Sequence, residues 1–517
     1  MRYVYGLSAA ILLGGAAATL TVGPVGAQTA QNDPGTMASA APRAGAPMSF
    51  ADLATKLQPA VVNISTKQSV QVNRSRQVPP GFEDFFRQFG VPVPDGGGGD
   101  APVTQRGGSL GSGFIISADG YVVTNNHVVS PARTGATVEQ ITVTLPDRRE
   151  FEAELVGRDT QSDLALLKIK GNNLPFVRFG DSKQTRVGDW VVAIGNPFGL
   201  GGTVTAGIVS ALHRNIGAGT YDRYIQTDAS INMGNSGGPM FDLQGNVIGI
   251  NTALISPTGG NVGIGFAIPA EQAFPIIDSL RKGQRPQRGY IGVGLQALDE
   301  DIAASLGIPK NQGELIRSVS PGGPAARAGI QQGDVVVSVG GRPVTPDESL
   351  AYLVSRTPIG SRTPVEIVRD GRRQTVNVAI GERPTEEEIA RMSGSEAETP
   401  VTEPAEAQQS SSQRSARESL GVTVQTLTPE IARSLRLRDV NLRGVVIASV
   451  NPGSDAAAKG IQPGDIILSI NQRATRTPEE AAGAVTAART AGRTTVLLLI
   501  RRGNDQPAYF GIALSKR

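Results

Sequence analysis

Residues 162–169 read SDLALLKI, a carboxylate followed by a short apolar run. A run of this length bounded by turn-forming residues is typical of a β-strand. Similar runs of four to six apolar residues recur between residues 57 and 269, at 61–64, 113–116, 121–124, 141–145, 190–194 and 247–250. Many short strands without intervening amphipathic helices predict a mostly β region of antiparallel sheets, closed into barrels or sandwiches. One helix over residues 270–282 is expected to leave this region.

The composition fits a β-rich chain with several domains. At 517 residues there is room for about three domains, and 64 glycines with 34 prolines indicate many turns and linkers. The low aromatic content of 4% argues against a polytopic membrane protein and a coiled coil. The formal net charge is only +3 and no long basic run is present, so nucleic acid is not an expected partner.

The chain has no cysteine and two histidines, His127 and His213. Disulfides, thiolate zinc sites, iron–sulfur clusters and cysteine nucleophiles are therefore excluded. A polyhistidine metal site is hard to build from two histidines. We expect no metal and no organic cofactor.

The N-terminal residues predict export. Arg2 precedes the apolar stretch 7–20, and Val25-Gly26-Ala27 has the small residues that a signal peptidase reads. Residues 1–27 are interpreted as a cleaved signal peptide, with an uncleaved anchor as the alternative. Residues 28–49 follow as a disordered spacer.

The second half of the chain contains an internal repeat. Residues 318–341 read SVSPGGPAARAGIQQGDVVVSVGG and residues 449–472 read SVNPGSDAAAKGIQPGDIILSINQ, with twelve of the positions identical. Each copy predicts a strand, a Pro-Gly turn, a short Ala-rich helix ending at glycine, and a second strand. Residues 384–418, rich in Glu, Ser, Gln, Pro and Thr, are expected to be a flexible linker between the copies.

Three residues carry the pattern of nucleophilic catalysis. Ser236 lies in GNSGGP, where glycines would expose its hydroxyl at a tight turn and turn backbone N–H groups towards an oxyanion, although an ordinary loop is the alternative. His127 in TNNHVV is the candidate general base, because histidine ordinarily titrates near pH 6.5. His213 lacks comparable flanks and is expected at the surface. Asp163 opens an apolar strand and is preferred over Asp159 as the carboxylate that orients the imidazole.

The order His127, Asp163, Ser236 is that of chymotrypsin. Together with the two repeats, the motifs TNNHVV, SDLALLKI and GNSGGP resemble the HtrA family, specifically the Do-type periplasmic serine endoproteases with two PDZ domains. The resemblance implies a chymotrypsin-like double β-barrel protease domain over residues 50–283, which includes a long loop at 73–108 whose phenylalanines either form a packing cluster or have a docking role. It implies PDZ domains over 286–383 and 419–516.

The resemblance also implies roles for further residues. The backbone N–H groups of Gly234, Asn235 and Ser236 would form the oxyanion hole. The segment 251–266 would line the substrate pocket, with the pocket residues Thr252, Ala253, Leu254, Ile255 and Ser256. Its aliphatic character suggests small or medium aliphatic side chains at the cleavage position. Asn235 stands where digestive proteases of this fold have aspartate, so activation by propeptide cleavage is not expected.

The PDZ resemblance implies binding of peptide C-termini. Tyr290, Ile291, Gly292 and Val293 in the first copy, and residues 419–422 in the second, look like carboxylate-binding loops. The family implies an ATP-independent endopeptidase of the periplasm that degrades unfolded or misfolded proteins, assembled as homotrimers or multiples of trimers. The alternative function is a chaperone or PDZ scaffold with minor proteolysis.

Overall fold

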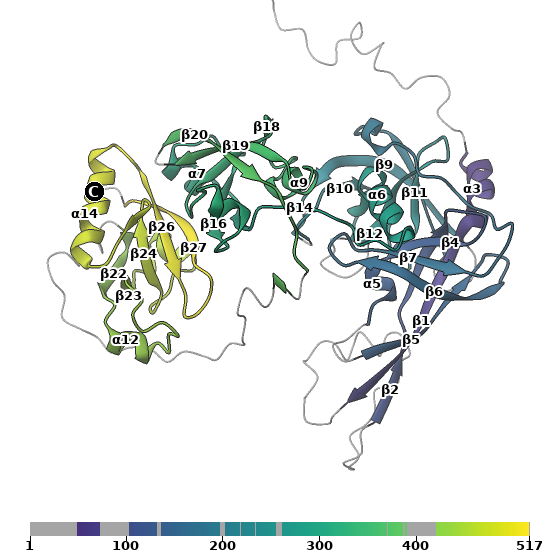
Figure 1. Ribbon diagram of the computed structural model, residues 1–517, viewed down its shortest axis with the longest axis horizontal. Helices are drawn as coiled ribbons and strands as arrows, with labels where there is room; N and C mark the ends of the chain where they lie inside the picture. The colour runs from purple at the N-terminus through teal and green to yellow at the C-terminus, as the bar shows by residue number, and fades with distance from the viewer. Residues whose placement is uncertain are drawn as a thin grey trace, which may run out of the picture. The chain divides into compact units, whose positions relative to one another are not determined.

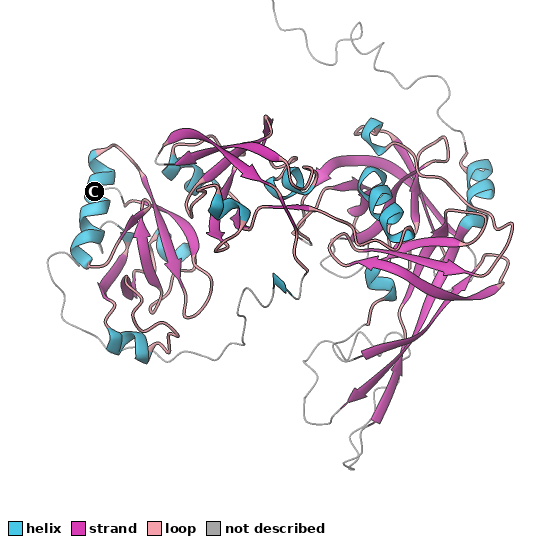
Figure 2. Cartoon of the chain, viewed as in Figure 1, coloured by secondary structure: helices cyan, strands magenta, loops and turns pink. Residues whose placement is uncertain are grey.

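The computed structural model describes residues 49–72, 103–131, 136–196, 202–217, 219–232, 234–254, 261–369, 371–385, 388–389 and 420–515. The expected signal peptide lies outside these residues, and so do nearly all of the expected spacer and linker. Strands dominate the described part of the chain (Figure 2). No helix within it is both long and apolar enough to cross a membrane.

The first barrel begins after helix α3 (Ala51–Leu57) and the short 3-10 helix η1 (Gln58–Ala60). Its strands run in the order β1-β3-β4-β7-β6-β5, and pairing of β1 with β5 closes the ring (Figure 1). Buried aliphatic side chains such as Val62, Ile115 and Leu167 fill it. The strands are β1 (Val61–Val72), β3 (Leu110–Ile115), β4 (Tyr121–Asn125), β5 (Ala136–Thr144), β6 (Glu150–Asp159) and β7 (Leu164–Ile169).

The last part of the loop expected at 73–108 contains a strand. Strand β2 (Val103–Gly107) pairs with the outer half of β1, from Gln68 to Val72. Its sequence VTQRG has no apolar run, so the strand is set by pairing with β1 rather than by its own pattern. Residues 73–102 lie outside the described residues.

The second barrel closes in the order β10-β13-β12-β11-β8-β9. The mostly β architecture with two closed barrels is therefore confirmed, and the choice between barrel and sandwich is resolved. Helix α6 (Ala270–Arg281) packs against β7 and β12 (Figure 1). It ends one residue before the predicted end. A short 3-10 helix, η2 (Ser182–Gln184), comes before β8 in the chain. The strands are β8 (Trp190–Gly195), β9 (Thr203–Arg214), β10 (Tyr224–Thr227), β11 (Pro239–Phe241), β12 (Val247–Leu254) and β13 (Gly265–Pro269).

The two repeats fold into similar five-strand paths with a short side strand: β15-β16-β17-β19-β20 and β22-β23-β24-β26-β27. The first contains β14 (Gly289–Tyr290), β15 (Val293–Gln296), α7 (Glu300–Leu306), β16 (Glu314–Val319), α8 (Pro324–Arg327), β17 (Val335–Val339), β18 (Arg342–Pro343), α9 (Leu350–Ser355), β19 (Arg362–Arg369), β20 (Arg372–Ala379) and β21 (Gly381–Glu382). The second contains β22 (Val422–Thr426), α12 (Pro429–Ser434), β23 (Val445–Val450), α13 (Asp455–Ala458), β24 (Ile466–Ile470), β25 (Arg473–Ala474), α14 (Pro478–Thr490), β26 (Thr495–Arg501) and β27 (Ala508–Ala513).

The Gly-Asp step of the repeat has the same physical role in both copies. Asp334 is 1% exposed and accepts two hydrogen bonds from Arg369, at 2.7 Å each. Asp465 is 2% exposed and accepts two from Arg502, at 2.7 and 2.8 Å. A buried carboxylate needs such a bidentate partner, because leaving it unpaired would cost about 3–5 kcal/mol.

The two repeat domains also contact each other. One apolar cluster joins Ile302 and Val335 of the first repeat to Leu497 and Tyr509 of the second. Burial raises the pKa of Tyr509 to about 12, with the carboxylate of Asp334 as a further cause. The two repeats on either side of the expected linker therefore pack against each other.

Candidate active site

Ser236 lies in the turn that joins β10 to β11. Gly234 and Gly237 flank the serine with φ of 99° and 83°, a region that favours glycine. A Cβ at Gly237 would collide with Ser112 O and Thr124 Oγ1. The glycines therefore allow the turn to pack directly on β3 and β4 of the first barrel.

The backbone around Ser236 is held by hydrogen bonds to the first barrel and to β8. The N–H of Ser112 donates to Ser236 O at 2.8 Å, and the Ser112 hydroxyl donates to Gly234 O. The same hydroxyl oxygen accepts the Asn196 N–H at 2.8 Å. Ser112 is fully buried. Through these hydrogen bonds it connects the turn around Ser236 to the residue that follows β8.

One expected oxyanion donor is already used within the turn. The Asn235 N–H donates to Asn232 O at 3.0 Å. The Asn235 N–H is thus engaged within its own segment in this structure, and its role as an oxyanion donor stays a prediction. The N–H groups of Gly234 and Ser236 are the other two expected donors.

His127 and Asp163 form a two-point contact between the segments that follow β4 and β6. His127 lies in the short helix α5 (Asn126–Val129), and its backbone N–H donates to Asp163 Oδ1 at 2.9 Å. Its Nδ1 lies 2.7 Å from Asp163 Oδ2. With Nδ1 engaged by the carboxylate, Nε2 is the nitrogen left to exchange a proton with a substrate or a hydroxyl.

Thr252 connects Asp163 to Ser236. Its hydroxyl donates to Asp163 Oδ2 at 2.8 Å, and its carbonyl accepts the Ser236 hydroxyl at 3.4 Å. His127 and Ser236, both within the described residues, share no hydrogen bond in this structure. Asp163 and Ser236 thus both bond to Thr252 of β12.

The two alternatives considered for the histidine and the carboxylate have other surroundings. Asp159, at the end of β6, binds Arg288 and Ser162 instead of His127. His213 lies near the end of β9 and has a φ of 59°. Its side chain is partly buried, so it is less exposed than expected. Burial lowers the pKa of His213 below its usual value, and the nearby Arg223 adds to this effect.

The expected pocket segment is described only in part. Thr252 is 8% exposed, and its hydroxyl donates to the Asp163 carboxylate. Ala253 and Leu254 continue β12, whereas Ile255 and Ser256 lie outside the described residues. Sequence reasoning missed Thr252 as a partner of Asp163 and missed Ser112 entirely, because both contacts join residues more than 80 positions apart.

Tyr224 is a further polar side chain of the second barrel, and it is partly buried. Its ring lies edge-on to that of Phe266, with centroids 6.1 Å apart. Burial raises the pKa of Tyr224 well above its usual value, and the carboxylates of Asp222 and Asp163 raise it further. The phenol is therefore neutral near pH 7, and it lies within electrostatic reach of Asp163.

The two expected carboxylate-binding loops have similar backbones. Gly292 has φ of 78° and Gly421 has φ of 72°. Their carbonyls accept N–H groups from Ser320 and Asn451 at 2.8 and 2.7 Å. Ile291 is 3% exposed, Tyr290 ends β14 and Val293 opens β15, whereas Ser419 lies outside the described residues.

The strands that follow these loops differ. Among the described strands, β15 pairs with β16 alone and β22 pairs with β23 alone, but all four residues of β15 remain partly exposed. In β22 the residues Val422, Thr423 and Val424 are buried, and helix α14 packs against the strand. The described residues contain no cluster of three or more Asp, Glu or His side chains arranged to hold a metal.

Comparison with protein families matches residues 111–250 to the trypsin-like peptidase domain, and residues 289–380 and 409–501 to the PDZ domain. A probable periplasmic serine endoprotease, DegP-like, from Brucella suis biovar 1 is 42% identical over 99% of this chain and 96% of that protein. A protein of the same description from Pseudomonas putida (strain W619) is 42% identical over 82% of this chain and 85% of its own length.

Solved structures give the same result over about two thirds of the chain. The HtrA-type protease AlgW with a decapeptide is 39% identical, with a TM-score of 0.52, and covers 65% of this chain and all of that one. The same protease with a tripeptide is 39% identical, with a TM-score of 0.51, and covers 66% of this chain and 99% of that one. With its trypsin-like domain and two PDZ domains, the chain belongs to the HtrA family of serine endoproteases, among its DegP-like members.

Proposed function

We propose that this protein hydrolyses unfolded or misfolded exported proteins, with Ser236 as nucleophile, His127 as general base and Asp163 as the carboxylate that orients the base. The contact of His127 Nδ1 with Asp163 Oδ2 at 2.7 Å carries the proposal. It fixes the imidazole by a charge-assisted hydrogen bond and leaves Nε2 for the serine proton. ATP, metal ions and organic cofactors have no role in this chemistry.

The acylation step follows from this arrangement. The Ser236 hydroxyl leaves Thr252 O, gives its proton to His127 Nε2 and attacks the carbonyl carbon of the scissile peptide. The carbonyl oxygen becomes an oxyanion that accepts the N–H groups of Gly234 and Ser236. Collapse of the tetrahedral intermediate breaks the C–N bond, and the amine leaves with the proton from His127. In deacylation, His127 takes a proton from water, and the water oxygen attacks the acyl carbonyl carbon. The acid product leaves and the proton returns to the Ser236 oxygen.

The first experiment is Ser236→Ala in the full chain. The substitution removes the nucleophile without adding a buried polar group, so cleavage of casein should fall by about 10⁶-fold while the fold persists. A fluorophosphonate probe should label the unmodified protein and not the variant. More than a few per cent of residual casein cleavage by the variant, or an unlabelled unmodified protein, would favour the alternative of a chaperone or PDZ scaffold.

For regulation we favour the first PDZ domain as receptor for peptide C-termini, through Tyr290, Ile291, Gly292 and Val293. The partly exposed edge strand β15 supports this choice, since an added peptide strand needs free backbone groups. In the second domain the matching strand β22 is also an edge strand, but three of its residues are buried and α14 packs against it. The solved structures of AlgW with a decapeptide and with a tripeptide support a peptide receptor in this family.

Calorimetry on the full chain carrying Ser236→Ala tests this choice. A peptide with a free apolar C-terminus should bind, and its amidated form should bind more weakly, because the amide lacks the carboxylate charge. Gly292→Ala should abolish binding, since alanine is strained at φ of 78°, and Gly421→Ala should leave it intact. Equal affinity for both peptides, or loss of binding only in Gly421→Ala, would refute the assignment.

Location and assembly complete the proposal. The relatives' names include the word periplasmic, and residues 1–27 have the pattern of a cleaved signal, so we place the mature protein in the periplasm. We also favour homotrimers or multiples of trimers. Light scattering coupled to size exclusion, with and without denatured casein, would measure the subunit number, and a monomer in both conditions would contradict this part.

A further inference from the structure

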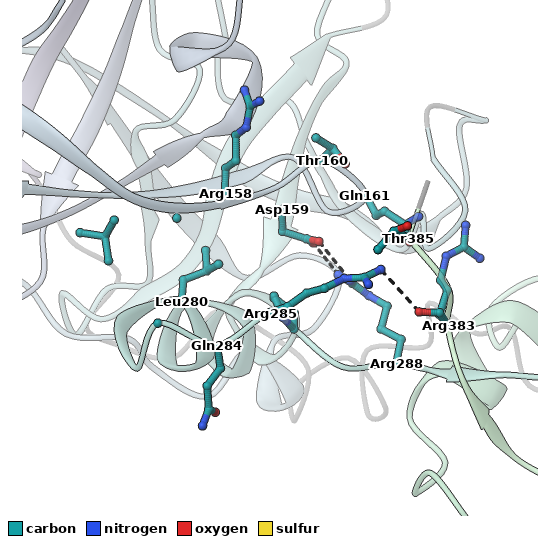
Figure 3. Close-up of a pocket in the computed structure, with 14 residues that line it drawn as sticks. Arg158, Asp159, Thr160, Gln161, Leu280, Gln284, Arg285, Arg288, Arg383 and Thr385 are labelled. Atoms are coloured by element: carbon teal, nitrogen blue, oxygen red, sulfur yellow. Dashed lines mark hydrogen bonds and ion pairs between the residues drawn. The ribbon is translucent and has the colours of Figure 1, made fainter. Parts of the chain in front are cut away.

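A cavity of about 390 Å³ lies between the end of β6, the end of α6 and the first and last residues of the first PDZ domain (Figure 3). The Asp159 carboxylate and the Arg288 guanidinium face each other in it (Figure 3). The family resemblance assigns neither residue a role, and Asp159 had been the alternative to Asp163 as the catalytic carboxylate.

The Asp159–Arg288 contact is bidentate and largely shielded from water. Arg288 Nη1 donates to Oδ1 at 3.0 Å and Nη2 donates to Oδ2 at 2.5 Å. The side chains are only 12% and 9% exposed. The Tyr221 ring lies 5.0 Å from the guanidinium, which adds a cation–π contact. A pair with this burial and geometry is held far more firmly than a surface salt bridge.

Arg288 is fixed from the PDZ side by backbone pairing. Its carbonyl accepts the Arg383 N–H at 3.0 Å, next to the β14–β21 pair of Gly289 and Glu382. The residues that follow it directly, Gly289 to Val293, form β14 and the proposed carboxylate-binding loop. The fold of the PDZ domain therefore holds the Arg288 guanidinium next to Asp159.

Asp159 also closes the turn that presents the triad aspartate. Its Oδ2 accepts the Ser162 N–H at 3.1 Å and the Ser162 hydroxyl. The next residue, Asp163, has φ of 54°, a conformation that costs a non-glycine residue about 1 kcal/mol or more. The turn has to hold this strained residue for its carboxylate to meet His127.

We propose that Asp159 is a positioning residue for Asp163 and that Arg288, supplied by the first PDZ domain, keeps the Asp159 carboxylate in place to close the 159–163 turn. The inference rests on the proposed role of Asp163. It predicts that the rate of the chemical step depends on a PDZ residue that does not touch the substrate.

The competing explanation is that the pair serves only to dock the PDZ domain on the protease domain. The two can be separated because Asp159 has one set of bonds to Arg288 and another to Ser162. Ser162→Ala removes the hydroxyl bond within the turn and leaves the contact with Arg288 intact. The exchanged pair Asp159→Arg with Arg288→Asp restores opposite charges between the domains and removes the acceptor for Ser162.

Full-chain variants are compared by kcat and KM on a short fluorogenic peptide, after their thermal unfolding midpoints show that they are folded. We expect kcat to fall about tenfold in Asp159→Asn and Arg288→Gln and about threefold in Ser162→Ala, with KM within twofold, because misplaced catalytic groups lower the chemical step. The exchanged pair should remain as slow as Asp159→Asn. Asp147→Asn, which breaks an exposed pair with Arg149 in the same barrel, is the matched control and should change kcat less than twofold.

An unchanged kcat in Ser162→Ala and Asp159→Asn would overturn the proposal, and recovery of the normal kcat by the exchanged pair would leave docking as the role of the contact. If Asp159→Asn fails to fold, Ser162→Ala still decides the question, because it removes one hydrogen bond from a half-exposed turn. Labelling of Ser236 by a fluorophosphonate in the unmodified protein is measured in parallel. Failure of that labelling would count against the proposed catalytic function rather than against the positioning role.

Discussion

At the scale of single residues, the triad depends on side chains that the motifs do not contain. Asp163 Oδ2 receives hydrogen bonds from both His127 and Thr252. Ser112 holds the carbonyl of Gly234 from a strand more than 100 residues earlier in the chain. Thr252 was expected to line the substrate pocket, yet its hydroxyl stabilises the charge on the carboxylate that orients the base.

Thr252→Val tests this role. Valine keeps the shape of threonine and removes the hydroxyl, so the Asp163 carboxylate loses one donor of the kind that contributes about 1.5–3 kcal/mol to a charged group. We expect kcat/KM for a small peptide substrate to fall about tenfold, without a change in the preferred side chain at the cleavage position. Steady-state kinetics on two peptides that differ at that position measures both effects. A changed preference with an unchanged kcat would instead assign Thr252 to the pocket wall.

At the scale of elements, a backbone N–H at the start of helix α9 of the first PDZ domain binds the partly buried carboxyl group of Glu314. Ser349 caps the helix through its side chain, and the Leu350 N–H donates to Glu314 Oε1 at 3.2 Å. Burial raises the pKa of Glu314 above its usual value of 4.5, while the Leu350 hydrogen bond lowers it by a smaller amount. Glu314 therefore binds its proton more tightly in the folded domain than in the unfolded chain.

The sign of the resulting pH effect follows from this difference. Because the folded state holds more protons, the free energy of unfolding falls as the pH rises from about 4.5 through the raised pKa of Glu314. Glu314→Gln keeps an acceptor for Leu350 and removes the titration. The variant should gain thermal stability relative to the unmodified protein more at pH 8 than at pH 5, as measured by scanning calorimetry. Glu366→Gln, an exposed residue of β19, is the control, and an equal difference at both pH values for Glu314→Gln would contradict the argument.

At the scale of the whole molecule, the second PDZ domain packs on α7 of the first. Lys459 forms an ion pair with Asp301 at 2.5 Å, and Gln296 exchanges two hydrogen bonds with the backbone of Tyr509. Gly511 lies so close to α7 that a Cβ there would collide with the backbone of Asp301. The contact combines apolar burial, a charge pair and close backbone approach, which together specify one relative placement of the two repeats.

Gly511→Ala should weaken this contact, because overpacking of a tight interface costs about 1–3 kcal/mol. Hydrogen exchange of the amides in α7 should then be about tenfold faster or more. Gly483→Ala in α14 is the matched control, since a Cβ at Gly483 meets no atom within 4 Å. Equal exchange rates in α7 for the two variants would show that the packing of the repeats does not protect that helix.

The sequence alone determined the features that depend on local pattern. Strand β7 was predicted over its full length, 164–169, because it is a continuous apolar run, whereas β9 was missed because its twelve residues mix Gly, Ala, Ser and Thr with few large side chains. The internal repeat predicted two similar domains. The resemblance to the HtrA family, carried by the three motifs and the repeats, implied a chymotrypsin-like double barrel with two PDZ domains, and this fold is confirmed.

Only the tertiary structure decided the contacts between residues distant in sequence. Asp159 and Asp163 lie only four positions apart, and the sequence favoured Asp163 over Asp159 as the catalytic carboxylate. It could not predict that Asp159 binds Arg288, which lies 129 residues away. The same holds for Thr252, for the Asn235 N–H that is used within its own turn, and for the packing of Tyr509 on the first PDZ domain. Periodicity records which face of a strand is buried, whereas the partner on that face is set by the closure of barrels and the docking of domains.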